Sequence, residues 1–281
     1  ILLISLVSLL GLFVGSFLNV VIYRLPLRLK DEWRTECREF LEVSETPAEA
    51  SQAPGSIFTS RSHCPHCGHL IGAFENVPVL SYIFRRGKCA ECHAGISPRY
   101  PLVEILTAIL SGLAAWSFGY GLALPLVLLL IWSLIALSFI DFDHQLLPDK
   151  LLLPILWLGL LVNSQNIITD LHSALYGAVA GYLVLWTVYH AFKLLTGKEG
   201  MGYGDFKLLA LLGAWMGWQM LPLVILLSSL VGAIAGILGI LILGRDKQLP
   251  IPFGPYLSVA GLIALFWGHA IVDSYLQFAG I

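Results

Sequence analysis

The chain has 281 residues, of which 57% are hydrophobic and 12% are charged, and its formal net charge at pH 7 is −2. Soluble domains usually carry about 25% charged residues, so this composition excludes an ordinary soluble protein and favours an integral membrane protein. The weak negative charge also argues against nucleic acid as a partner, and the first partner that the composition indicates is the lipid bilayer.

Long apolar segments recur along the chain, and a membrane-spanning helix needs roughly 20 mostly apolar residues. The first segment ends near Tyr23 without a small-residue cleavage site, so we expect a retained helix and not a removed signal peptide. The sequence therefore predicts an all-α polytopic membrane protein with about eight transmembrane helices. These predicted helices span residues 1–23, 101–118, 121–140, 151–167, 172–194, 206–219, 221–243 and 255–279.

The distribution of Lys and Arg predicts how these helices are oriented. Residues 24–100 hold ten of the sixteen basic residues, and eight helices would place the other six on the same side of the membrane. The opposite connections, around 119–121, 164–171 and 217–220, hold none. Because cytoplasmic loops are enriched in Lys and Arg, we expect the basic side to be cytoplasmic and both termini to lie on the other side.

Three parts of the chain are expected from this pattern: a first transmembrane helix at 1–23, a small cytoplasmic domain at 24–100 and a seven-helix membrane domain at 101–281. Within the cytoplasmic domain, residues 31–56 are acidic and rich in Ser, Ala and Pro. That composition is typical of a partly disordered insert.

The cytoplasmic domain contains two Cys-x-x-Cys pairs, Cys64 with Cys67 and Cys89 with Cys92. Two such pairs at this spacing predict a site that binds one zinc ion through four thiolates. Four protein ligands leave no open position for a substrate, so the predicted zinc is structural and forms a zinc knuckle between the first and second helices. Free thiols or a redox pair are the alternative, and the neighbouring histidines are expected to be solvated.

Two carboxylates are predicted at the cytoplasmic ends of helices. Asp141 follows an apolar run at the end of the third predicted helix, and Asp205 opens the sixth after alternate glycines that include Gly202 and Gly204. Ionisable groups at membrane depth are costly and are functional candidates. The glycines predict an extended backbone that a substrate can reach, with Asp205 facing a hydrated cleft. The alternative is an ordinary loop in which Asp205 caps its helix.

Four further charged residues are candidates for supporting such a site. Asp143 and Asp149 follow Asp141, but Asp141 lies deepest, since Asp149 is expected to cap a helix and Asp143 to be solvated. Glu104 either lines the site or is an acid at a helix N-terminus that the helix dipole favours. Lys207 either interacts with Asp205 or extends its ammonium group to the membrane interface.

Two carboxylates that share a proton can hydrolyse a peptide bond, because one acts as base on water and the other as acid toward the carbonyl oxygen. The sequence has no G-x-S-x-G serine motif and no H-E-x-x-H zinc motif, so among peptidase mechanisms the residues permit the aspartyl pair. A non-enzymatic transporter with an Asp proton relay is an alternative, although we find no repeated halves of the kind that transporters show.

The chain resembles the bacterial type IV prepilin peptidases over nearly its whole length. The motifs that carry this resemblance are the first-helix segment Gly15–Pro26, the cysteine-bearing segment 64–104, IDFDHQLLPD at 140–149 and GYGDFK at 202–207. The last of these contains the G-x-G-D signature that preflagellin peptidases, presenilins and signal peptide peptidase share.

The resemblance implies that Asp141 and Asp205 are catalytic and that the protein lies in the bacterial inner membrane with periplasmic termini. It implies cleavage of the basic leader of prepilins and pseudopilins after a glycine at the cytoplasmic face. It also implies N-methylation of the new N-terminus with S-adenosylmethionine. No glycine-rich dinucleotide motif supports that cofactor independently. Another G-x-G-D protease with a different substrate is the nearer alternative.

Overall fold

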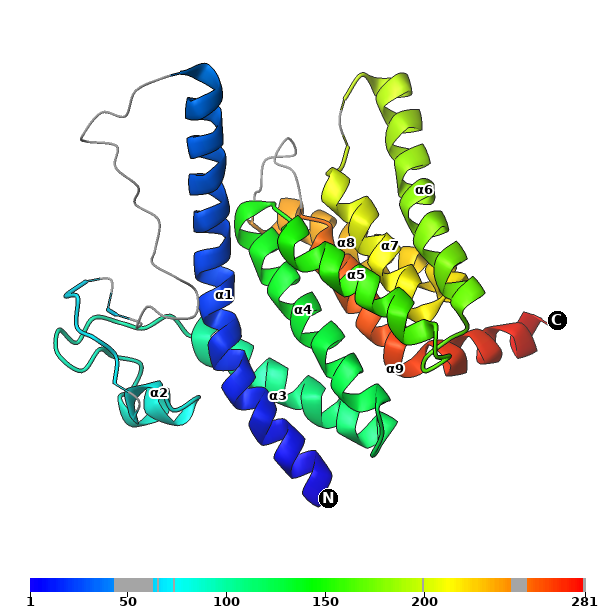
Figure 1. Cartoon of the computed structure of the whole chain (residues 1–281). Helices are drawn as coiled ribbons and strands as arrows, with labels where there is room; N and C mark the ends of the chain where they lie inside the picture. The colour runs from blue at the N-terminus through cyan, green and yellow to red at the C-terminus, as the bar shows by residue number, and fades with distance from the viewer. Residues whose placement is uncertain (43–62, 65, 73, 199, 244–251, 280–281) are drawn as a thin grey trace. The chain divides into compact units, whose positions relative to one another are not determined.

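The structure is a computed structural model in which the residues described are 1–42, 63–64, 66–72, 74–198, 200–243 and 252–279. Within these ranges the chain is helical apart from loops and two isolated β-bridges (Figure 1). It divides into two compact units, residues 1–116 and residues 117–281. Most of the acidic insert predicted at 31–56 lies outside the described residues.

The first unit contains the long helix α1 (Leu2–Leu41), the short helix α2 (Leu80–Phe84) and most of α3 (Arg99–Phe118). Helix α1 begins as expected but continues well past residue 23, through Pro26, to Leu41. The sequence predicted an end at residue 23, where the apolar segment stops. The residues that follow are rich in Leu, Arg, Lys and Glu, which are strong helix formers and extend the helix.

Helices α1 and α3 approach each other closely. A Cβ atom on Gly15 would lie 2.7 Å from the Cα atom of Glu104, so only glycine permits this contact. The buried Asn19 donates a hydrogen bond of 3.1 Å from Nδ2 to the carbonyl oxygen of Tyr100, in the first turn of α3. This bond satisfies a polar group at membrane depth.

The second unit is a bundle of six helices among the described residues (Figure 1). They are α4 (Ala123–His144), α5 (Asp149–Asn163), α6 (Leu171–Thr196), α7 (Tyr203–Met216), α8 (Leu221–Leu243) and α9 (Gly254–Ala279). Together with α1 and α3, these six helices correspond to the eight apolar segments that the sequence predicted to be helical. Among the residues that the structure describes, six helices are long and apolar enough to cross a membrane, namely α1, α3, α4, α6, α8 with its preceding turn, and α9. Helices α5 and α7 have 15 and 14 residues and fall short of that length.

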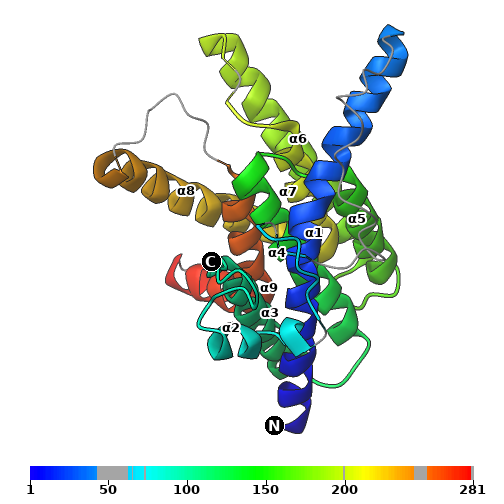
Figure 2. The ribbon, with the colours of Figure 1, turned by 90° about the vertical axis from the view of Figure 1, so that its left-hand side faces the viewer.

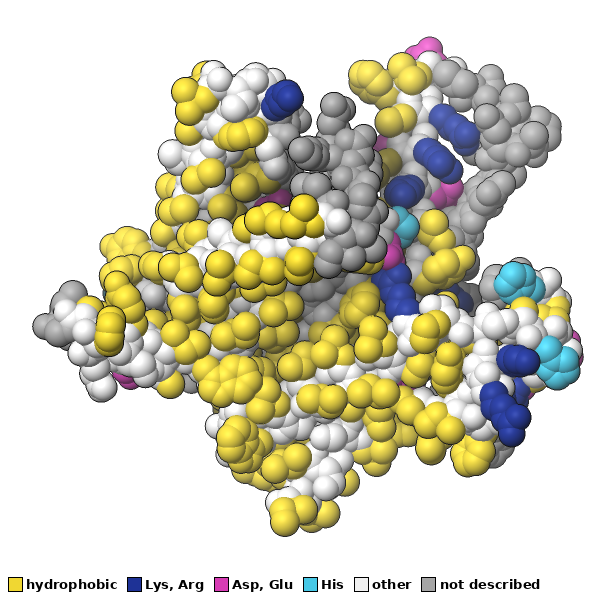
Figure 3. Space-filling model, turned by 180° about the vertical axis from the view of Figure 1, so that it is seen from behind, with side chains coloured by type: hydrophobic (Ala, Val, Ile, Leu, Met, Phe, Trp, Pro, Cys, Tyr) yellow, Lys and Arg dark blue, Asp and Glu magenta, His cyan; other side chains and the backbone are white. Residues whose placement is uncertain are grey.

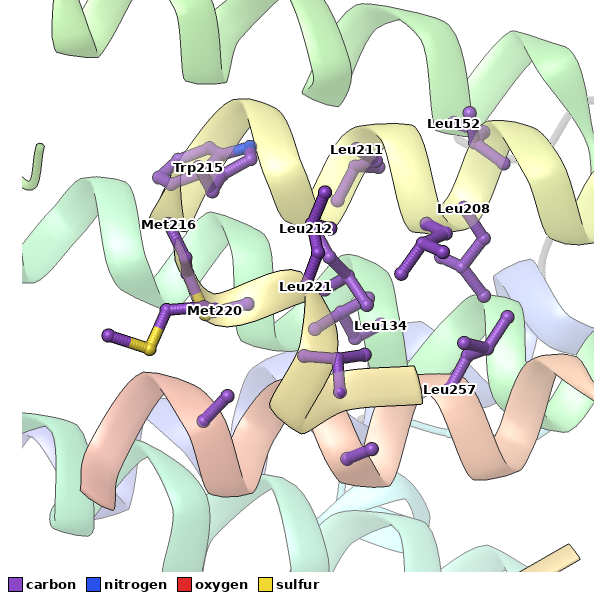
Figure 4. Packing of buried hydrophobic residues seen from close by; sticks show 14 of the residues in the cluster. Leu134, Leu152, Leu208, Leu211, Leu212, Trp215, Met216, Met220, Leu221 and Leu257 are labelled. Atoms are coloured by element: carbon purple, nitrogen blue, oxygen red, sulfur yellow. The ribbon is translucent and has the colours of Figure 1, made fainter. Parts of the chain in front are cut away.

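Helix α7 forms the centre of the second unit. It packs against α5, α6 and α9, and nearly all of its side chains are buried, including Leu208, Leu211 and Trp215 (Figure 4). The contact with α6 is very close, since a Cβ atom on Gly177 or Gly213 would overlap the backbone of the other helix. An element this enclosed holds its first turn, and therefore Asp205, in a defined position.

Helix α8 has a different environment, because it keeps α9 as its main neighbour and extends away from α6 and α7 (Figure 2). Its exposed side chains include Leu226, Leu230 and Ile234. Hydrophobic side chains also predominate on the face of the molecule drawn in Figure 3. Exposed apolar surface of this extent is expected where lipid is the solvent.

Candidate functional site

Asp141 lies in the last turn of α4, and its side chain is buried, with 6% of its surface exposed. The backbone N–H of Gly254, the first residue of α9, donates a hydrogen bond of 3.0 Å to its Oδ2 atom. The predicted position at the end of an apolar helix is therefore correct, and the α9 N-terminus supplies a donor that was not predicted.

Asp205 is the third residue of α7 and is equally buried, at 6% exposed. Its Oδ2 atom accepts a hydrogen bond of 3.3 Å from the backbone N–H of Gly202, the residue that precedes the helix. Asp205 and Asp141 interact through their charges, and α4 and α7 both pack against α9. The structure thus brings together the two carboxylates that the sequence singled out.

The structure confirms only part of the extended, accessible stretch that the sequence predicted before Asp205, since Gly202 is extended and exposed but Gly204 is helical. Gly202 has φ −85° and ψ 153°, which any residue can adopt, and Gly204 already lies within α7. The hydrogen bond from Gly202 to Asp205 closes the first helical turn and draws the chain into the helix. Gly204 allows α7 to pack closely against Leu147, since a Cβ atom at position 204 would lie 2.8 Å from Cβ of Leu147.

The remaining charged candidates of the second unit lie at its surface. Asp143 is exposed, and Asp149 is the exposed first residue of α5. Lys207 forms hydrogen bonds of 2.7 and 2.8 Å from Nζ to the two carboxylate oxygens of Asp149. Lys207 therefore pairs with Asp149, not with Asp205, and the pair joins the first turns of α5 and α7.

Glu104 belongs to the first unit, where it is buried within α3. Its Oε2 atom accepts a hydrogen bond of 2.7 Å from the backbone N–H of Val79. Val79 has φ 60° and ψ −48°, and Leu80 donates back to the carbonyl oxygen of Pro78. This is a γ-turn, a strained conformation for a β-branched residue. Glu104 therefore stabilises the turn that precedes α2. Glu104 itself lies beyond the first turn of α3, so it is not an acid at the helix N-terminus.

The four cysteines of the two Cys-x-x-Cys pairs form one cluster, and their Sγ atoms all lie within 4.8 Å of one another. The Sγ atoms of Cys64 and Cys92 are 3.8 Å apart, and those of Cys67 and Cys89 are 4.0 Å apart. Four thiolates around one ion at zinc–sulfur distances of about 2.3 Å would be separated by roughly 3.8 Å. The donor set and its spacing fit a metal site.

Both cysteine pairs sit in turns of the same construction. An isolated β-bridge closes each turn, between His63 and Leu70 and between Lys88 and Gly95. The residue after each second cysteine has a left-handed backbone, with φ 73° at Gly68 and 56° at His93. This geometry directs both thiols of each pair to one point.

Backbone N–H groups in these turns favour the thiolate form of the first cysteine in each pair. The N–H groups of Cys67 and His66 lower the pKa of Cys64 to about 7. Those of Cys92 and Glu91 lower the pKa of Cys89 below its ordinary value. Because the thiolate is the metal ligand, these N–H groups favour metal binding at Cys64 and Cys89.

The histidines near the cysteines were expected to be solvated, and His63, His66 and His93 are exposed, but His69 instead connects the two cysteine turns. Its Nε2 atom lies 2.9 Å from Oε2 of Glu75, and its Nδ1 atom lies 3.1 Å from Oε1 of Glu91. Glu75 also accepts hydrogen bonds from Gly72 and Arg85. The Gly72 N–H, His69 and Arg85 lower the pKa of Glu75 to about 2. Sequence reasoning missed this network, because no motif marks it.

An apolar cavity of about 450 Å³ is lined in part by the residues that precede α7 and α9. Met201 lies in the loop before Asp205, and Phe253 precedes Gly254. Small residues on α8 leave room for this cavity. The lining residues are Val184, Leu185, Val188, Met201, Ile225, Ser229, Gly232, Ala233, Phe253 and Tyr256. A cavity of this composition suits an apolar chain.

Comparison with known families matches two successive parts of the chain. Residues 9–118 match the Bacterial Peptidase A24 N-terminal domain, and residues 128–237 match the Type IV leader peptidase family. The first match includes the four cysteines, and the second includes both buried aspartates.

Similar proteins named "Prepilin leader peptidase/N-methyltransferase" match nearly the full chain. The protein from Stutzerimonas stutzeri is 58% identical over 270 residues, which cover 96% of this chain and 92% of the relative. The protein from Pseudomonas aeruginosa is 56% identical over 272 residues, covering 97% and 93%. That from Legionella pneumophila is 46% identical over 272 residues, covering 97% and 94%. No solved structure matches the chain.

Proposed function

The chain belongs to the Type IV leader peptidase family, and from this premise we propose that it removes the leader of prepilins and then methylates the new N-terminus. Its substrates are the type IV prepilins and the pseudopilins of type II secretion, cut after a glycine at the cytoplasmic face of the bacterial inner membrane. The observation that carries the proposal is the meeting of buried Asp141 and Asp205 in a chain so similar to named prepilin peptidases.

The proposed mechanism of cleavage uses Asp141 and Asp205 as a pair. Two carboxylates at close range cannot both ionise cheaply, so they share one proton. The ionised partner takes a proton from water, which attacks the scissile carbonyl carbon, and the protonated partner donates to the carbonyl oxygen. The resulting tetrahedral intermediate breaks the C–N bond, and a proton returns to the leaving amine.

Each carboxylate is held by one backbone donor, Asp141 by Gly254 and Asp205 by Gly202. Such donors fix the orientation of a carboxylate and support the proposed roles, since proton transfer requires the acid and the base at hydrogen-bonding distance from the substrate. The pair of Lys207 with Asp149 joins the first turn of α7, which carries Asp205, to the first turn of α5.

We propose that the cysteine cluster binds zinc, which has a structural role. Cys64, Cys67, Cys89 and Cys92 would supply all four ligands, leaving no position for water or substrate. Zinc would supply folding free energy to a segment with little apolar core of its own.

The proposal of N-methylation rests on the name of the relatives, which includes N-methyltransferase. S-adenosylmethionine would supply an electrophilic methyl group to the amine that cleavage exposes. No residue of this chain is assigned to that cofactor.

We further propose that the eight helices α1 and α3 to α9, including the shorter α5 and α7, cross or enter the membrane with both termini in the periplasm. The support is the placement of Lys and Arg on one side under this arrangement. A single cysteine in the 119–121 connection should react with an impermeant thiol reagent in intact cells, in a variant whose native cysteines are replaced. Labelling at 119–121 only after cell lysis would contradict the orientation.

The function is tested with purified protein in detergent and a full-length prepilin. Mass spectrometry should find cleavage after the leader glycine, and a further mass gain of one methylene that depends on added S-adenosylmethionine. A protein that leaves the prepilin intact, under conditions in which a relative such as that of Pseudomonas aeruginosa cleaves it, would refute the proposal.

A further inference from the structure

The first turn of α9 contacts one of the two proposed catalytic carboxylates, although α9 lies far along the chain. Gly254 and Asp141 are 113 residues apart, and the hydrogen bond from the Gly254 N–H to Oδ2 of Asp141 measures 3.0 Å. Both residues are buried. Contact with Asp141 is therefore a feature of the folded bundle that no local motif predicts.

The local backbone leaves this N–H free for Asp141. Phe253 precedes the helix, and its carbonyl oxygen accepts hydrogen bonds of 3.1 Å from both Tyr256 and Leu257. Pro255 has no N–H to offer. Of the first-turn donors that a helix leaves unpaired, the one at Gly254 is thus directed at the carboxylate.

The same position has no room for a side chain. A Cβ atom on residue 254 would lie 2.7 Å from Oδ2, 3.1 Å from Cγ and 3.4 Å from Cβ of Asp141. The contact is with the end of a side chain and not with backbone, so a substitution would displace the carboxylate before it disturbed the helices. Position 254 therefore controls where the carboxylate of Asp141 lies.

The partial charges at the two helix ends favour the contact between Gly254 and Asp141. Asp141 lies at the C-terminal end of α4, where the helix dipole disfavours a negative charge. The N-terminus of α9 carries the opposite partial charge and supplies the hydrogen-bond donor. Because α9 packs against both α4 and α7, its first turn is fixed relative to the helices that carry Asp141 and Asp205.

We propose that Gly254 is a positioning residue for cleavage, whose N–H and missing side chain together hold the Asp141 carboxylate in register with Asp205. This inference rests on the proposed function, in which the two carboxylates act as a pair. Gly254 acts through Asp141 and does not itself react.

The kinetic test compares Gly254→Ala with Gly268→Ala in the full-length protein. Gly268 is a matched control on the same helix, where a Cβ atom would lie 2.8 Å from Sδ of Met220, well along α9 from the carboxylates. Misplacing a catalytic group by about 1 Å can cost about 100-fold in rate. Gly254→Ala should therefore lower kcat for prepilin cleavage by about 10- to 100-fold and leave KM within about twofold.

Gly268→Ala should retain the wild-type kcat, and both variants should unfold at similar temperatures. The proposal is overturned if Gly254→Ala keeps its kcat within about twofold of wild type, if its loss appears only in KM, or if Gly268→Ala loses as much.

A spectroscopic test does not depend on activity or on a variant at position 254. The dipeptide Phe-Gly occurs twice in the sequence, at 118–119 and 253–254, so labelling Phe carbonyl carbon and Gly nitrogen selects two amide signals. Asp141→Ala should move the Gly254 amide proton upfield through loss of its acceptor and leave Gly119 unchanged. An unmoved Gly254 signal would overturn the contact. Failure of wild-type protein to cleave prepilin would instead refute the proposed function.

Discussion

At the scale of single residues, Asp141 and Asp205 occupy opposite ends of helices. Asp205 lies in the first turn of α7, where the dipole and the Gly202 N–H favour a carboxylate. Asp141 lies in the last turn of α4 and obtains its donor from a different helix. The two carboxylates are thus held in unlike environments, which suits a pair that must carry one proton between them.

The pair of Lys207 with Asp149 should contribute little to the free energy of unfolding. Its side chains are 31% and 51% exposed, and exposed ion pairs contribute about 0–1 kcal/mol. A double-mutant cycle of Lys207→Met and Asp149→Asn, followed by denaturant unfolding in detergent, measures the coupling directly. A coupling energy well above about 1 kcal/mol would show that the pair is a main brace of α7.

The sequence allowed Asp141, Asp205 and the four cysteines to be singled out, because each carries a side chain whose chemistry is visible in a short motif. Gly254 could not be found in this way. Its role comes from a backbone N–H and from an absent side chain, and its partner is 113 residues away. Lys207 was recognised as a candidate, but its partner Asp149 is 58 residues distant and the sequence did not distinguish it from Asp205.

At the scale of secondary structure, α7 is fixed at the end opposite Asp205. Fully buried Asn163 donates from Nδ2 to the carbonyl oxygens of Ala214 and Trp215, at 2.9 and 3.0 Å. Its Oδ1 atom accepts from the backbone N–H groups of Ile168 and Thr169. One side chain thus satisfies the C-terminal carbonyls of α7 and the loop that enters α6.

Asn163→Ala should destabilise the protein by about 1–3 kcal/mol, because buried backbone groups would lose their partners. Unfolding in a graded mixture of mild detergent and dodecyl sulfate measures the change. Ser164→Ala removes a hydrogen bond at an exposed neighbouring position and is the control, with an expected effect within about 0.5 kcal/mol. Equal stability of the two variants would contradict the capping role.

Apolar run length predicted which segments are helices better than it predicted their limits. Each expected apolar segment is helical, but α1 extends to Leu41, because strong helix formers continue the helix beyond Pro26. Helices α5 and α7 are too short to meet the usual spanning length alone. Tight packing at Gly177 and Gly213 encloses α7 among its neighbours, and the sequence of α7 does not display such contacts.

At the scale of the whole molecule, the chain forms two compact units with different sources of stability. The unit of residues 117–281 has an extensive apolar core around α7. The segment around the cysteines has short helices and two isolated bridges, and no buried residue within α2. Stability there should depend on the metal, which the spacing of the cysteines allowed us to predict.

Purified protein should contain one zinc ion per chain, measured by elemental analysis. Cys67→Ser with Cys92→Ser should abolish zinc binding and expose residues 63–97 to proteolysis, while the helical circular dichroism of the membrane helices persists. Cys37→Ser is the control, since Cys37 is an exposed cysteine outside the cluster. Protein that holds four reduced thiols but no metal would contradict the assignment.

Cleavage of a prepilin by purified Asp141→Asn and Asp205→Asn, beside Asp143→Asn and Asp149→Asn, tests the proposed carboxylate pair most directly. The first two variants should each lose at least about 100-fold in kcat, because each removes one half of the acid–base pair. The other two remove exposed carboxylates outside the pair and should stay near the wild-type rate. Wild-type cleavage by either Asp141→Asn or Asp205→Asn would contradict the assignment of the site.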